Sequence, residues 1–289
     1  MGGTALISYI DEFFRDPKGM LVFFLLAFPG RILALSLHEF AHAWVAYRCG
    51  DNTAKMMGRM TINPLKHLDP LGTALMLLVG FGWAKPVPVD PRNFRDYRRD
   101  DLKVSLAGVT MNLIMFVLSM IIMIVVVGFA LSRVPDGNLL TTGVNVYRMN
   151  YLGSDALIFP AENTYIPIAT LLNNLPYYPA EALIKPVFGE VAGYLYQMVG
   201  YFSMTNLVLC LFNLLPIPPL DGYHVLNDLI LRRKQLFADP RVARYASMAL
   251  FVLVLTGVVG KALGWLDTQI LTGAGHVAAA ALRAFGLMA

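Results

Sequence analysis

The chain has 289 residues, of which 57% are hydrophobic and 15% are charged. A soluble protein of this length has about 25% charged residues, so the composition excludes a soluble globular domain and predicts a polytopic membrane protein. The formal net charge is only +4, and we expect no nucleic-acid partner. The two cysteines, Cys49 and Cys210, are far apart in the chain and indicate neither a disulfide framework nor a redox motif.

In chain order, the first predicted element is a short interfacial helix within residues 1–19, whose apolar side chains form one stripe: Leu6, Ile10, Phe13 and Phe14. Four later stretches are long and apolar enough to cross a membrane, at about 20–47, 103–131, 198–230 and 243–262. Leu71–Trp83 is too short to cross, and we interpret it as a re-entrant segment after the first span. Residues 265–287 are either a weak last span or a surface helix, and we favour the surface helix. The predicted fold class is therefore an all-α polytopic membrane protein.

The basic residues predict which loops face the cytoplasm. Ten of them fall in residues 48–103 and five in 231–244, against three in the long connection 132–197. We therefore expect the first two regions inside the cell and 132–197 outside. The predicted organisation is an N-terminal helix (1–19), the first half of the core (20–131), an outward-facing insert (132–197), a further core helix (198–230) and C-terminal accessory helices (231–289).

The sequence His38-Glu39-Phe40-Ala41-His42 lies inside the first apolar stretch. Residues four apart share one face of a helix, so His38 and His42 can bind one metal ion together. Glu39 can act as general base toward water, as in the zinc peptidases that carry this spacing. Ionisable side chains at bilayer depth cost on the order of 2–3 kcal/mol each. Three of them within one turn predict a functional site rather than a chance match.

Two other apolar stretches carry a polar residue at a similar depth. From the rise of a helix, His38 lies roughly 15 Å and His42 roughly 9 Å from the cytoplasmic end of the first stretch. Asn112 lies roughly 14 Å, and Asp221 roughly 15 Å, from the same surface. We therefore expect these side chains to meet in one layer.

Asp221 is the predicted third ligand, because a catalytic zinc takes three protein ligands and keeps one position open for water. It follows a proline-rich break between Pro216 and Pro219, where the freed backbone can bind an extended peptide. The alternative for Asp221 is a helix cap, and the alternative third ligand is His224, which lies nearer the headgroups. His67 lies in a polar loop, where it either packs the loop or faces the substrate.

Three motifs in this order resemble those of the site-2 protease family, the intramembrane zinc metalloproteases: HExxH at His38–His42, Gly-x-x-x-Asn at Gly108–Asn112 and Asn-x-x-Pro-x-x-Pro-Leu-Asp-Gly at Asn213–Gly222. The segment Gly82–Val89, Gly-Trp-Ala-Lys-Pro-Val-Pro-Val, resembles the hallmark of a compact bacterial and archaeal branch. The resemblance implies a site-2 protease-like helical core. It also implies the plasma (inner) membrane of a prokaryote, with the active site toward the cytoplasm.

The resemblance further implies that His38, His42 and Asp221 are the ligands of Zn²⁺. Glu39 would be the general base, and Asn112 would bind substrate or the tetrahedral oxyanion. The predicted substrate-binding residues are Asn213, Pro216 and His67.

The predicted function is hydrolysis of peptide bonds in or near transmembrane segments, so the expected partners are a transmembrane protein or peptide and the lipid bilayer. Two alternatives stay open. A metal-binding transporter predicts polar residues at several depths along a path, whereas here they crowd one layer. A catalytically inactive membrane scaffold predicts a loss of motif residues, whereas all four are present: His38, Glu39, His42 and Asp221.

Overall fold

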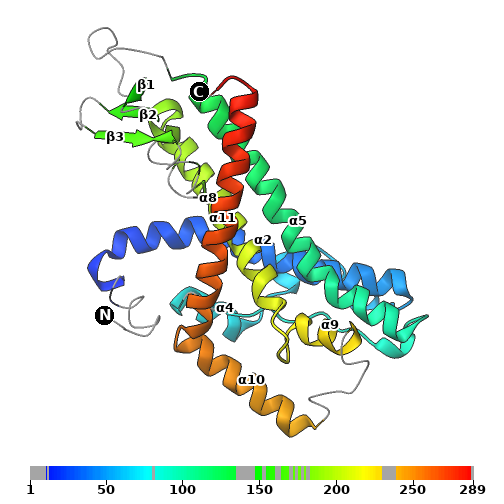
Figure 1. Ribbon diagram of the computed structural model, residues 1–289. Coiled ribbons are helices and arrows are strands. Elements are labelled where there is room, and N and C mark those ends of the chain that lie inside the picture. Colours follow the sequence, from blue (N-terminus) through cyan, green and yellow to red (C-terminus); the bar gives the residue numbers. More distant parts are fainter. Residues whose placement is uncertain are drawn as a thin grey trace. The chain divides into compact units, whose positions relative to one another are not determined.

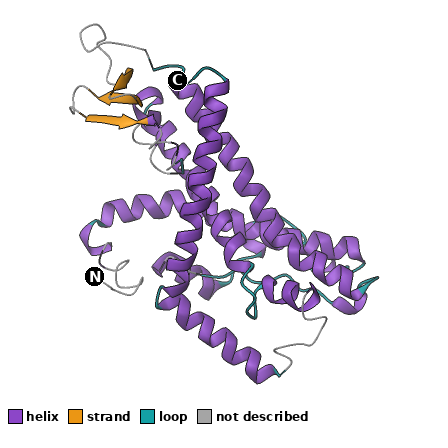
Figure 2. Cartoon of the chain, in the orientation of Figure 1, coloured by secondary structure: helices purple, strands orange, loops and turns teal. Residues whose placement is uncertain are grey.

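The computed structural model describes residues 11, 13–79, 82–134, 147–151, 154–159, 164–168, 172, 175–176, 179, 183–229 and 239–287. Helices make up most of this part of the chain (Figures 1 and 2). The first half contains α2 (Pro17–Cys49), α3 (Thr53–Met56), η1 (Pro64–Lys66), α4 (Pro70–Val79), η2 (Pro91–Asn93) and α5 (Tyr97–Leu131). The second half contains α7 (Lys185–Phe188), α8 (Glu190–Asn213), α9 (Asp221–Leu229), α10 (Pro240–Leu255) and α11 (Val258–Ala284).

The long helices have the length and composition of membrane spans. Helices α2, α5 and α8 each qualify alone, and α10 with α11 qualifies as a pair bent by 69°. Gly257 lies at this bend with a φ of 77°, a left-handed conformation that interrupts a helix. These helices confirm the predicted fold class, a polytopic membrane protein built on an α-helical core.

The chain divides into two compact units. The first consists of Met1–Phe116 and Thr205–Gly264, and the second of Val117–Met204 and Trp265–Ala289. All the predicted site residues belong to the first unit.

The second unit contains a small antiparallel sheet of strand order β1-β2-β3, formed by β1 (Tyr147–Tyr151), β2 (Ser154–Phe159) and β3 (Thr164–Pro167). In its register Tyr147 pairs with Ile158, and Phe159 pairs with Thr164. The sheet lies in the predicted outward-facing insert, for which the sequence had suggested no fold.

Two of the predicted spans differ from the observed helices. The stretch 198–230 is interrupted, because α8 ends at Asn213 and α9 begins at Asp221. Proline lacks a backbone N–H and cannot continue a helix, and three prolines lie in the gap. The break lies before Asp221, whereas the depth of Asp221 was counted forward to Arg232, over α9 and residues outside the described part of the chain, so that depth stays a prediction. The predicted boundary between 243–262 and 265–287 is also wrong, since α10 ends at Leu255 and α11 runs unbroken from Val258 to Ala284, across that boundary.

The chain enters and leaves the re-entrant segment at neighbouring positions. Helix α4 has ten residues and is about 15 Å long, which is too short to cross a bilayer. Leu68, just before α4, forms an antiparallel bridge with Ala84 beyond it. Lys85 N–H also donates a hydrogen bond to His67 O at 2.7 Å. The two ends of the segment therefore lie side by side, as the re-entrant prediction requires.

The C-terminal end of α2 is hydrogen-bonded to the chain that follows the re-entrant segment. Asp51, two residues beyond α2, is almost completely buried. Its carboxylate accepts hydrogen bonds from Asn93 Nδ2 at 2.9 Å and from the Asp90 N–H at 2.8 Å. It also accepts one from the Thr53 N–H at 3.0 Å. Asp51 thereby fixes residues 90–93 against the helix that carries the histidine pair.

Two predictions lie outside the described residues in whole or in part. The interfacial N-terminal helix depends on Leu6 and Ile10, which are not described, whereas Phe13 and Phe14 are described and exposed. The basic run Arg232–Lys234, used for the orientation, is likewise outside the described part of the chain.

Candidate metal centre

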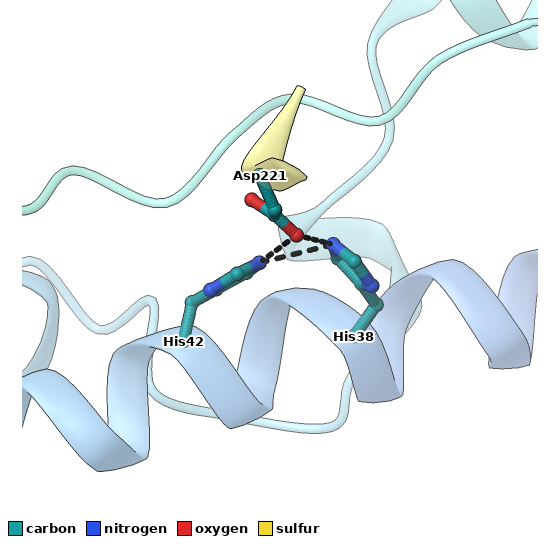
Figure 3. Close-up of side chains that lie close together, drawn as sticks. All are labelled: His38, His42 and Asp221. Atoms are coloured by element: carbon teal, nitrogen blue, oxygen red, sulfur yellow. Dashed lines mark hydrogen bonds and ion pairs between the residues drawn. The ribbon is translucent and has the colours of Figure 1, made fainter. Parts of the chain in front are cut away.

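Two histidine side chains on α2 meet at one point. His38 and His42 are one turn apart on the same face of the helix, as Figure 3 shows. Their Nε2 atoms are 3.0 Å apart, and both side chains are buried. The spacing of the motif thus produces the shared face that it predicts.

Asp221 brings the third donor atom from α9. Its Oδ2 lies 3.3 Å from the Nε2 atom of His38 and 3.3 Å from that of His42 (Figure 3). The oxygen is buried and receives no hydrogen bond from the described residues. The chain turns in the proline-rich break, so that Asp221, the first residue of α9, lies beside His38 and His42 of α2.

The hydrogen bonds of the two Nδ1 atoms determine whether the Nε2 atoms carry a lone pair. His38 Nδ1 lies 2.6 Å from Asn112 Oδ1, and His42 Nδ1 lies 2.8 Å from the carbonyl oxygen of Val104. Both of these partners are acceptors, so each neutral imidazole donates from Nδ1 and carries a lone pair on Nε2. Two nitrogen lone pairs and a carboxylate oxygen therefore point at one another.

This donor set fits a zinc ion. Zinc binds imidazole nitrogen and carboxylate oxygen at about 2.0–2.2 Å in a tetrahedral arrangement, which separates neighbouring ligand atoms by roughly 3.3 Å. The three observed separations are 3.0, 3.3 and 3.3 Å. Three converging lone pairs repel one another without a cation. Two histidines and one carboxylate leave a fourth position for water or substrate, as catalytic zinc sites do.

Gly108 on α5 lets this helix lie directly against the histidine pair. A Cβ atom on Gly108 would lie 2.4 Å from His38 Cε1 and 2.4 Å from His42 Nε2. No side chain therefore fits at this position. The first residue of the Gly-x-x-x-Asn motif provides the space for the two imidazoles.

Glu39 lies beside the histidines and is held by the segment that follows the re-entrant helix. Its Oε2 accepts a hydrogen bond from the Val87 N–H at 2.7 Å, and the side chain is 9% exposed. Arg59 Nη2 donates to the carbonyl oxygens of Lys85 and Pro86 at 2.7 and 3.3 Å, which orients the same segment. A backbone hydrogen bond thus restrains the carboxylate of the predicted general base.

Asn112 reaches the site in a different way from that predicted. The residue is completely buried, its oxygen accepts from His38, and its Nδ2 donates to Asn206 Oδ1 at 2.8 Å and to Ala34 O at 3.5 Å. Both amide hydrogens are engaged, so this geometry does not support the predicted oxyanion role. It places Asn112 behind His38, where it orients the imidazole.

The remaining predicted residues lie outside the donor cluster. His224 is half-exposed, and its Nδ1 lies 3.6 Å from Asp101 Oδ2. His67 is 1% exposed and its Nε2 donates to Thr61 O at 2.7 Å, so it packs within the loop. Asn213 is half-buried with its Nδ2 donating to Leu209 O at 3.0 Å, and Pro216 is exposed in the break before α9.

The structure also shows contributors that the sequence reading missed. Asn206, on α8, is completely buried beside Asn112. It is a strongly polar residue within an apolar helix, which is the same signal that identified Asn112. The Val87 N–H and the Val104 carbonyl act through the backbone, so no side-chain pattern could have indicated them.

Comparison with known proteins identifies the class. Residues 24–257 match Peptidase family M50, and the chain belongs to this family, the site-2 protease family. The chain is 32% identical over 221 residues to "Putative zinc metalloprotease YwhC" of Bacillus subtilis, covering 76% of this chain and 75% of the relative. No solved structure matches the chain.

Two mycobacterial relatives carry the name "Putative zinc metalloprotease Rip2". The one from Mycolicibacterium smegmatis is 34% identical over 247 residues, covering 85% of this chain and 72% of the relative. The one from Mycobacterium tuberculosis strain H37Rv is 24% identical over 268 residues, covering 89% and 78%. The protein is therefore a site-2 type zinc metalloprotease with zinc as its cofactor.

Proposed function

We propose that this protein hydrolyses peptide bonds within or beside the transmembrane segments of membrane proteins. The observation that carries the proposal is the place of the three converging donor atoms, two of which belong to a helix long and apolar enough to span a membrane. His42 lies roughly 10 Å along the axis from the end of α2 at Cys49. A site at this depth suits a substrate that is itself inside the bilayer.

The geometry supports the following proposed roles. His38, His42 and Asp221 hold the zinc ion, which when bound polarises the scissile carbonyl and lowers the pKa of a bound water to about 7. Glu39 takes a proton from the attacking water and later delivers it to the leaving amine. The Val87 N–H holds the Glu39 carboxylate in one orientation through both transfers.

The substrate has to reach this site as an extended chain. All amides of a transmembrane helix are paired, so the scissile bond becomes accessible only after local unwinding, and helix-weakening residues favour that step. We propose the break from Asn213 to Leu220 as the binding segment, because it lies directly before Asp221 and carries the exposed Pro216. From the distribution of basic residues we propose that cleavage occurs near the cytoplasmic face of a prokaryotic plasma membrane.

The experiment that tests the proposal uses the purified chain in proteoliposomes with a tagged single-span helix as substrate. Glu39→Gln should keep its zinc and lose at least about 100-fold in cleavage rate, because general base catalysis contributes about 10²–10⁴-fold. Glu190→Gln is the matched control, since this glutamate is exposed and paired with Lys185 at 3.2 Å. It should cleave like the wild type.

Two results would contradict the proposal. Residual turnover of Glu39→Gln above about 1% of the wild type would exclude Glu39 as the general base. Cleavage of soluble peptides without any cleavage of the embedded helix would exclude membrane-embedded segments as the substrate.

A further inference from the structure

A chain of hydrogen bonds leads from α8 through α5 to the metal centre. Asn206 is completely buried on α8, and its Oδ1 accepts a hydrogen bond from Asn112 Nδ2 at 2.8 Å. Asn112 Oδ1 in turn accepts from His38 Nδ1 at 2.6 Å. His38 presents its other nitrogen to Asp221 Oδ2. Asn206 is thus two hydrogen bonds away from a donor atom of the cluster without touching it.

The direction of this chain determines the tautomer of His38. A carboxamide can turn over by 180°, which exchanges its oxygen and its NH₂ group with little change in shape. If Asn112 turned over, its NH₂ group would face His38 Nδ1 and favour the tautomer that carries its proton on Nε2. That tautomer has no lone pair for a metal ion.

The neighbours of Asn112 oppose this reversal. Its NH₂ group faces two acceptors, Asn206 Oδ1 at 2.8 Å and Ala34 O at 3.5 Å. After a reversal, the Asn112 oxygen would face both of them, and a buried pair of acceptors without a hydrogen is unfavourable. The shorter of the two contacts comes from Asn206, so this residue contributes most to the orientation.

We propose that Asn206 is a positioning residue of the zinc site, which holds Asn112 in the orientation that keeps the lone pair of His38 Nε2 directed at the metal. The inference rests on the proposed role of His38 as a zinc ligand. Partners of metal-ligating histidines change metal affinity or activity by about 10–100-fold when they are removed. The effect of Asn206 should therefore appear in zinc affinity itself, before any substrate is added.

The test measures zinc affinity of the metal-free full-length chain in detergent, by competition with a chromophoric chelator. Asn206→Leu has a similar size but no acceptor, and it should bind zinc at least about 10-fold more weakly. Asn206→Asp keeps an oxygen toward Asn112 and should stay within about 3-fold of the wild type. Cys210→Ala, one turn further along α8 and also buried, is the matched control for a change in packing.

A second background separates orientation from packing. Asn112→Asp presents an acceptor to His38 in either orientation, so the reversal no longer matters. In this background Asn206→Leu should add less than about 3-fold to the loss of zinc affinity, so the two substitutions should not be additive. Helical content by circular dichroism should be equal in all variants.

The outcomes distinguish the inference from the proposed function. If Asn206→Leu binds zinc as tightly as Cys210→Ala does, or loses the same factor in the Asn112→Asp background, Asn206 only fills space and the inference is wrong. In both cases a wild type that binds zinc leaves the proposed function intact. If the wild type itself does not bind zinc, the proposed ligand set fails and the inference fails with it.

Discussion

At the scale of single residues, the metal centre depends on where lone pairs point. Each imidazole uses Nδ1 for a buried acceptor, so both Nε2 atoms and the Asp221 carboxylate converge without a hydrogen between them. His224, only three positions from Asp221, faces Asp101 instead. Sequence spacing alone left both residues as candidates for the third ligand, and the geometry of α9 distinguishes them.

The first prediction concerns this third ligand. Asp221→Ala should lose zinc, because two histidines alone provide too few ligands for a stable site. His224→Ala should keep zinc, since its imidazole lies outside the cluster. Metal analysis of the two purified variants, with the wild type beside them, measures both. The reverse pattern would show that His224 is the third ligand.

The second prediction concerns the space between α5 and the histidine pair. Gly108→Ala should weaken zinc binding by at least about 10-fold, because its Cβ would lie 2.4 Å from atoms of both imidazoles. Gly260→Ala on α11 is the control, since a Cβ there meets no atom within 4 Å. This control should bind zinc normally and gain up to about 1 kcal/mol of stability from helix propensity. Equal zinc affinity for the two variants would contradict the close packing at Gly108.

At the scale of elements, the site depends on the segment after the re-entrant helix α4. This segment is hydrogen-bonded to residues just beyond the C-terminal end of α2. The chain after the re-entrant helix provides the Val87 N–H for Glu39, and Asp51 holds the same chain through Asp90 and Asn93. Burial raises the pKa of the Asp51 carboxyl, but the hydrogen bonds from Thr53, Asn93 and the Asp90 N–H outweigh burial. The pKa therefore lies below its ordinary value.

The third prediction follows from this lowered pKa. Because the pKa of Asp51 is lower in the folded chain than in the unfolded chain, where it is about 3.9, its stabilising effect is complete at neutral pH and is lost as the pH falls below about 4. Asp51→Asn should therefore lower the melting temperature in detergent at pH 7, at a cost of roughly 1–3 kcal/mol. The difference from the wild type should shrink near pH 3. A difference that does not depend on pH would contradict the role of the carboxylate.

Part of this arrangement of elements could be predicted from the sequence. Periodicity and composition predicted α2, α5 and the re-entrant segment, and the His38–His42 spacing predicted a shared helix face, because each of these depends on local sequence. The end of α8 at Asn213 was indicated by the prolines, but the direction in which α9 starts was not. That direction depends on packing between segments far apart in the chain.

Residues that act through partners were the least predictable. Asn112 was identified by its depth, yet its orientation toward His38 depends on Asn206, from another helix. The restraint on Glu39 comes from a backbone N–H, which any residue except proline provides. The small sheet β1-β2-β3 was not predicted, because a tyrosine- and proline-rich connection has no single periodic pattern.

At the scale of the whole molecule, the orientation in the membrane determines from which side substrates approach. Leu68 pairs with Ala84, so residues before and after the re-entrant segment lie on one side. From the ten basic residues of 48–103 we propose that this side faces the cytoplasm.

The fourth prediction tests this orientation with an impermeant thiol reagent added to intact cells. A cysteine at Arg95 should resist labelling, and a cysteine at Asn163 should be labelled. The native thiols, Cys49 and Cys210, are buried and give a low background. Labelling in the opposite sense would place the metal centre nearer the outer surface.

The central claim is that a zinc-dependent peptide-bond cleavage takes place at membrane depth, and the site of the cut in a substrate tests it most directly. The wild-type chain, reconstituted in liposomes with a single-span substrate, should give products whose new ends, read by mass spectrometry, fall inside or at the cytoplasmic edge of the apolar segment. Removal of zinc should stop the reaction, and adding zinc back should restore it. Cuts confined to the water-exposed tails, or cuts that persist without zinc, would contradict the claim.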